Sequence, residues 1–152
     1  MHKKYFIQTP YVLKFLTIGT VICMTSALIS ISDFAHANEP QCSPKQHASV
    51  PVITNMTYHK ARKILLAKGW QPLQTKNFNT ASDDPDIAYG NGKKFWAKGY
   101  VEVEACAGTG TAPCAFLFKD VYGTTLRLFT LGEEIPESKA FARVSGFRFI
   151  CN

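Results

Sequence analysis

The sequence has 152 residues, including five cysteines, and carries a formal net charge of +6 at pH 7. This length is enough for one domain with one hydrophobic core once a leader is removed, and too short for two. The charge alone does not indicate nucleic-acid binding, which a dense basic patch would favour, so we set that class of function aside.

The first 37 residues have the pattern of a secretory signal peptide. A basic start leads into a mostly apolar run at residues 15–31, and residues 35–37 form a small-x-small tripeptide typical of a cleavage site. An uncleaved membrane anchor is the rival interpretation, but the run is barely long enough to span a bilayer and contains several hydroxyl residues. A lipoprotein is disfavoured because Ile22, rather than a small residue, precedes Cys23.

Cleavage after Ala37 would leave a single domain, residues 38–152, in the periplasm or outside the cell. The leader contains three lysines and one aspartate, so its loss lowers the formal charge to +4. The mature protein is then not an integral membrane protein.

The four remaining cysteines are an even number in a small exported domain, which predicts two disulfides and allows three pairings. We favour Cys106–Cys114, because a hairpin would bring these residues together, and Cys42–Cys151 follows by elimination. Zinc binding is disfavoured because no Cys-x-x-Cys pair is present.

After a polar, proline-containing arm at residues 38–51, one helix is predicted at residues 57–69. Thr57 suits the N-cap, and Gly69 suits a left-handed C-cap. Apolar side chains at helical spacing predict the core face: Tyr58, Ala61, Ile64 and Leu65. The remaining surface is basic and is either solvated or a docking surface for an anionic partner or polymer; its candidate residues are Lys60, Arg62, Lys63 and Lys68.

Residues 55–72 read Asn-Met-Thr-Tyr-His-Lys-Ala-Arg-Lys-Ile-Leu-Leu-Ala-Lys-Gly-Trp-Gln-Pro. They resemble the Met-Ser/Thr-x-x-x-Ala-x-x-x-Leu-x-x-x-Gly opening of small exported α+β modules, as in peptidoglycan-associated PASTA modules and the β-lactamase-inhibitor-protein type of fold. The two cysteine pairs have no counterpart in a PASTA module. A helix followed by a Glu-Val-x-x-Cys-x-Gly-x-Gly hairpin is also similar to uncharacterised small periplasmic proteins.

A strand at residues 70–74, marked as an edge strand by Pro72, precedes a long irregular region at residues 75–98. Connections of this length are often functional or disordered, and the aromatic residues here argue against disorder. Its acidic residues lack the ligand order of an EF-hand, so a solvated turn is favoured over a calcium site. Its aromatic residues either cover the core, which we favour, or anchor a partner. The candidate partner-binding residues are Asp83, Asp84, Asp86, Tyr89, Phe95 and Trp96.

A β-hairpin is predicted at residues 100–118, followed by strands at 124–131 and 141–151, the last with a bulge at Gly146. Leu126 and Leu128 alternate with polar or exposed positions, the pattern of a sheet with one covered face. The predicted fold is therefore α+β: one N-terminal amphipathic helix packed on an antiparallel meander of about four strands.

No pattern in the sequence indicates catalysis, a cofactor or a metal. The Gly-Thr-Gly-Thr run at 108–111 leads into a strand, whereas phosphate loops lead into a helix. His47 and His59 have no evident nucleophile beside them. Glu102 and Glu104 would share one face of a strand about 7 Å apart, a spacing that suits a glycosidase, but an exposed strand face explains them equally well.

We therefore expect an exported binding protein that is not an enzyme, most readily an inhibitor or immunity protein that captures a protein partner in the cell envelope. The alternative is a module that binds peptidoglycan or another anionic polymer through the basic helix surface. A small hydrolase is the third candidate.

Overall fold

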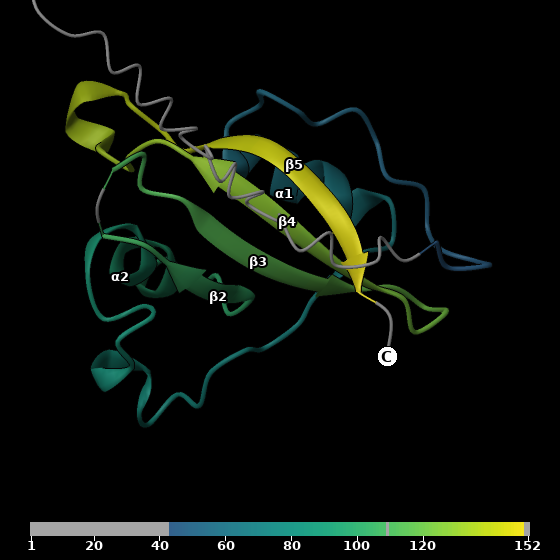
Figure 1. Cartoon of the computed structure of the whole chain (residues 1–152), viewed down its shortest axis with the longest axis horizontal. Helices are drawn as coiled ribbons and strands as arrows, with labels where there is room; N and C mark the ends of the chain where they lie inside the picture. The colour runs from purple at the N-terminus through teal and green to yellow at the C-terminus, as the bar shows by residue number, and fades with distance from the viewer. Residues whose placement is uncertain (1–42, 109, 151–152) are drawn as a thin grey trace, which may run out of the picture. The chain divides into compact units, whose positions relative to one another are not determined.

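The structure is a computed structural model that describes residues 43–108 and 110–150, all within the compact unit Ala37–Asn152. These residues form two α helices and a five-stranded antiparallel sheet (Figure 1). The predicted α+β class is confirmed, but the predicted number of elements, one helix and about four strands, is wrong. The predicted signal peptide and the Cys42–Cys151 bridge lie outside the described residues.

Helix α1, Tyr58–Ala67, confirms the predicted helix, but it follows residues 43–57 and so is not N-terminal within the described part of the chain. Its buried face consists of Tyr58, Ala61 and Leu65. Gly69 has a left-handed φ of 92° and donates its N–H to the carbonyl of Leu66 at 3.1 Å, which closes the last turn as expected. Thr57 precedes the helix but makes no side-chain capping bond; it instead forms an antiparallel bridge with Arg143.

The sheet has the order β1–β3–β4–β5, and β2 also pairs with β3. The strands are β1 Gln71–Pro72, β2 Val103–Cys106, β3 Cys114–Lys119, β4 Thr125–Leu131 and β5 Arg143–Ile150. The short β1 and β2 share one edge of β3: β1 pairs with its last two residues and β2 with its first three. The predicted edge position of Pro72 is thereby confirmed.

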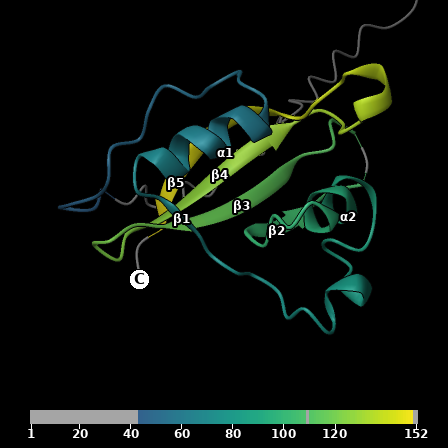
Figure 2. The same cartoon turned by 180° about the vertical axis from the view of Figure 1, so that it is seen from behind.

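The core lies between α1 and one face of the sheet (Figure 2). Phe116 pairs with Leu128 and Phe118 with Leu126, and all four side chains are fully buried. The residues between them face away from α1, which confirms the predicted alternation. In β5 the register shifts at Ser145, so a bulge lies next to Gly146, where one was predicted.

Helix α2, Gly90–Ala97, lies in the segment predicted to be irregular, so that prediction is wrong for these residues. Its first turn contains two glycines, which disfavour a helix in isolation. The turn that leads into the helix requires one of them: a Cβ on Gly92 would lie 2.6 Å from the Cα of Ile87. The helix forms because it buries Asn91 and Phe95. Local helix propensity does not include the stability that this burial contributes.

The predicted Cys106–Cys114 disulfide is confirmed. The two cysteines lie directly opposite one another in β2 and β3, with their Cα atoms 4.1 Å apart and a sequence separation of 8. We expect the double variant Cys106→Ala, Cys114→Ala to lose about 2–3 kcal/mol in free energy of unfolding, because the unfolded chain regains the entropy of an open loop. Urea denaturation monitored by fluorescence measures the loss; an unchanged midpoint would contradict the prediction.

Candidate functional site

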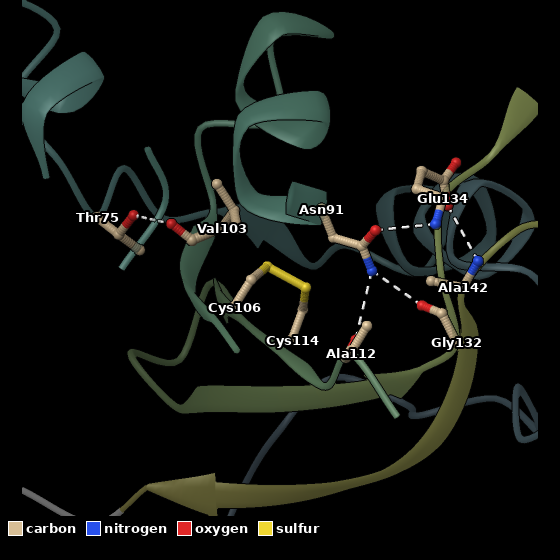
Figure 3. The surroundings of a disulfide bond; sticks show 9 residues. All are labelled: Thr75, Asn91, Val103, Cys106, Ala112, Cys114, Gly132, Glu134 and Ala142. Carbon is tan, nitrogen blue, oxygen red and sulfur yellow. Dashed lines mark hydrogen bonds between the residues drawn. A yellow bond between two sulfur atoms is a disulfide. The ribbon is translucent and has the colours of Figure 1, made fainter. Parts of the chain in front are cut away.

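The loop at residues 75–89 is fixed to the sheet at both of its ends. Thr75 donates its N–H to the carbonyl of Val101 at 3.1 Å and its hydroxyl to the carbonyl of Val103 (Figure 3). At the other end, the N–H of Cys106 donates to the carbonyl of Asp86 at 2.8 Å. Ile87 is also buried, so the loop has a defined conformation against the disulfide hairpin.

Two of the three acidic residues of this loop share a lysine. Lys76 Nζ lies 3.0 Å from carboxylate oxygens of both Asp84 and Asp86, while Asp83 is exposed. The hydrogen bond from Lys76 lowers the pKa of Asp84, and a backbone N–H from Asp86 acts in the same direction. Lys76 therefore holds the Asp84 and Asp86 side chains in place.

The aromatic residues of the region divide between the core and the surface. Phe95 is fully buried, with its ring centroid 5.2 Å from that of Tyr58, so it belongs to the core rather than to an exposed surface. Tyr89 is 77% exposed. Trp96 is half-buried and lies against Phe78, which is itself 63% exposed.

Phe78 is a surface residue that the sequence analysis missed. The sequence feature that could have indicated its exposure is the position of this aromatic residue between two asparagines in an otherwise polar loop. Together with the predicted residues that remain accessible, it defines what we call the loop surface: Phe78, Asp83, Asp84, Asp86, Tyr89 and Trp96.

The basic residues predicted on α1 do not all face solvent. Lys60, Lys63 and Lys68 are exposed. Arg62 instead donates from Nε to Glu102 Oε1 at 2.6 Å, and its guanidinium lies 4.5 Å from the centre of the Tyr100 ring. Arg62 is therefore part of an internal ion pair, and three of the four predicted cations remain accessible.

Glu102 is fully buried, which corrects its assignment to an exposed strand face. It lies just before β2 and accepts a hydrogen bond from the Tyr58 hydroxyl at 2.6 Å, whereas Glu104 pairs with Arg127 of β4 at 2.6 Å. The register of β2 shifts between Val103 and Ala105, so the two carboxylates do not share a face. Burial, followed by the charge of Glu102, raises the pKa of Tyr58 well above its ordinary value.

A second buried carboxylate, Glu134, connects both helices to the segment that precedes β5. Its Oε1 pairs with His59 Nε2, and its Oε2 accepts from the N–H of Ala142 at 3.0 Å. Its backbone N–H donates to Asn91 Oδ1 at 2.8 Å (Figure 3). Its carbonyl accepts from Lys94 Nζ at 2.5 Å. All four polar atoms of Glu134 thus have protein partners, which indicates a structural crosslink.

His59 completes this connection, since its Nδ1 lies 2.9 Å from the Tyr100 hydroxyl while its Nε2 faces Glu134. Because a carboxylate accepts hydrogen bonds, Nε2 carries the proton. Among the described residues, neither nitrogen has a hydrogen bond to a serine or cysteine side chain, and the two contacts fix the orientation of His59 on α1.

Among residues 43–108 and 110–150, no group of three His, Cys, Asp or Glu side chains is close enough to hold a metal ion. No helix in the same part of the chain is both long and apolar enough to cross a membrane. Comparison with protein-family models, curated proteins and solved structures gives no match to this chain, so its function is inferred from these residues alone.

Proposed function

We propose that this protein is an exported, non-enzymatic binding protein that captures a protein partner in the cell envelope, as an inhibitor or an immunity protein. The observation that carries this proposal is the exposure of two aromatic side chains, Phe78 and Tyr89, on a loop whose backbone is fixed to the sheet. Aromatic residues contribute much of the binding energy at protein interfaces. A loop that is already ordered loses little conformational entropy when it binds.

The acidic residues of the loop surface indicate the chemistry of the partner. Asp83, Asp84 and Asp86 concentrate negative charge on a chain whose net charge is positive. Charge complementarity steers association and excludes partners of the wrong sign. We therefore infer that the partner presents basic residues around an apolar pocket that accepts an aromatic side chain.

The double variant Phe78→Ser, Tyr89→Ser tests this proposal. We expect the affinity-tagged wild-type protein to enrich a specific envelope protein, and the variant to lose most of that enrichment while keeping the wild-type thermal midpoint. The matched control is Val52→Ser, Tyr122→Ser, which removes two other exposed apolar side chains. Crosslinking and mass spectrometry measure the enrichment. Equal recovery by both double variants would overturn the proposal.

Binding of peptidoglycan or another anionic polymer remains the second candidate, and the exposure of Lys60, Lys63 and Lys68 on α1 supports it. The polymer-binding proposal is weaker than partner capture because Arg62 is paired with the buried Glu102. The accessible basic surface is therefore smaller than the sequence suggested. Lysines that are distributed over a helix surface are also common on proteins that bind no polymer.

A further inference from the structure

A pocket of about 420 Å³ lies where β4 ends and β5 begins, and none of its lining residues belongs to the loop surface. Leu131 and Arg143, which are cross-strand partners in β4 and β5, line it together with Asn55, Thr111 and Ser145. Its volume falls within the range of sites that hold small ligands, but it is a shallow hollow that is open to solvent rather than an enclosed cavity.

One wall of the pocket is held by hydrogen bonds from a buried side chain. Asn91, which is 4% exposed, donates from Nδ2 to the carbonyls of Gly132 and Ala112, at 2.9 Å and 3.3 Å (Figure 3). Gly132 in turn donates its N–H to the carbonyl of Thr111 at 2.8 Å. The segments on this side of the pocket are therefore fixed before any ligand binds.

The opposite wall is equally fixed. The N–H of Asn55 donates to the carbonyl of Val144 at 2.8 Å, and Arg143 Nη1 donates to the carbonyl of Asn55 at 2.8 Å. Asn55 has a φ of 65°, a left-handed conformation that asparagine tolerates in turns.

The chemistry of the lining selects the ligand. Arg143 is the one charged residue among the lining residues, and a guanidinium has five N–H donors, of which one is used by Asn55. Leu131 is 43% exposed beside it and offers an apolar contact. We propose that this pocket binds a carboxylate at the end of a short aliphatic chain, with the carboxylate on Arg143 and the chain on Leu131. A free acid and the C-terminal leucine of a peptide share this chemistry.

Titration of the ¹⁵N-labelled full chain with N-acetyl-leucine and with acetyl-Ala-Ala-Leu tests the proposal. We expect both acids to give saturable shifts of the amides of Leu131, Gly132, Val144 and Ser145. N-acetyl-leucinamide, which lacks the carboxylate, is expected to bind at least about tenfold more weakly. Tighter binding of the peptide identifies a peptide C-terminus as the ligand, and equal binding identifies the free acid. Absence of saturable shifts, or equal affinity for acid and amide, would overturn the proposal.

Two variants connect the binding to these residues. Arg143→Gln is expected to weaken binding of the acid by about tenfold or more, because it removes the charge-assisted hydrogen bonds. Because Arg143 also bonds Asn55, Leu131→Asp provides a second test that leaves this bond intact and repels the carboxylate. Lys119→Gln, at an exposed position on the same sheet, is the matched control and should bind like the wild type. Wild-type affinity in Leu131→Asp would contradict the proposed site.

Discussion

Replacing Arg62 with methionine is expected to lower the free energy of unfolding by about 3 kcal/mol. The variant leaves the carboxylate of Glu102 fully buried with a hydrogen bond from Tyr58 but without its cation. The loss of an opposite charge from a buried pair costs more than the pair contributes, because desolvation of the remaining ion is no longer offset. Arg62 itself keeps some contact with solvent, so we expect the lower end of the range for such pairs.

The neighbouring residue on α1 provides the matched control. Lys63 is exposed, and Lys63→Met is expected to change the free energy of unfolding by less than about 0.5 kcal/mol. The double variant Arg62→Met, Glu102→Leu should recover only part of the loss, because it removes both charges from the interior but leaves the buried Tyr58 hydroxyl without its acceptor. Urea denaturation measures all three. If Arg62→Met and Lys63→Met had equal effects, Arg62 would belong to the basic surface after all, and the polymer-binding proposal would regain its fourth cation.

The features of the fold that could be predicted depend on short-range patterns. The spacing of Tyr58, Ala61 and Leu65 is set by the helix period, and the alternation of Leu126 and Leu128 is set by the pleat of a strand. A hairpin with cysteines beside its turn leaves little choice of disulfide. These signals are local, and the structure confirms all of them.

The features that could not be predicted depend on contacts between distant parts of the chain. The glycines of its first turn disfavour α2 locally, and the helix forms because Asn91 bonds the segment at residues 132–134 and Phe95 packs against Tyr58. Glu102 has the sequence environment of an exposed strand, and its burial follows from a register shift in β2 and from an arginine 40 residues earlier. The residue types and their spacing in the sequence do not indicate either contact.

The candidate site was predicted in part for the same reason. The sequence indicated the loop and its acidic residues, because turn-forming and charged residues are typical of solvent-exposed segments. The favoured interpretation of its aromatic residues as a cover of the core is wrong for Tyr89, which is 77% exposed. The sequence could not separate Phe95, which fills the core, from Phe78, which lies on the surface. Both are aromatic residues in a segment without a clear period, and only the packing of α2 distinguishes them.

Replacing Glu134 with alanine is the second change with a large expected effect. The side chain joins His59 of α1 to the N–H of Ala142, and the backbone of the same residue is held by Asn91 and Lys94 of α2. Loss of the carboxylate leaves a buried N–H without an acceptor and removes the partner of His59. We expect the free energy of unfolding to fall by about 3 kcal/mol in urea denaturation.

Glu133→Ala is the matched control, because Glu133 is exposed and carries the same charge one position away. We expect that variant to remain within about 0.5 kcal/mol of the wild type. Hydrogen exchange should also distinguish the two variants, because Glu134→Ala frees His59 of α1 from the segment that precedes β5. Faster exchange in α1 with equal partner capture would separate this crosslink from the proposed function, whereas loss of capture in Glu134→Ala alone would connect them. Equal stability of the two variants would mean that the Glu134 carboxylate does not hold α1 to this segment.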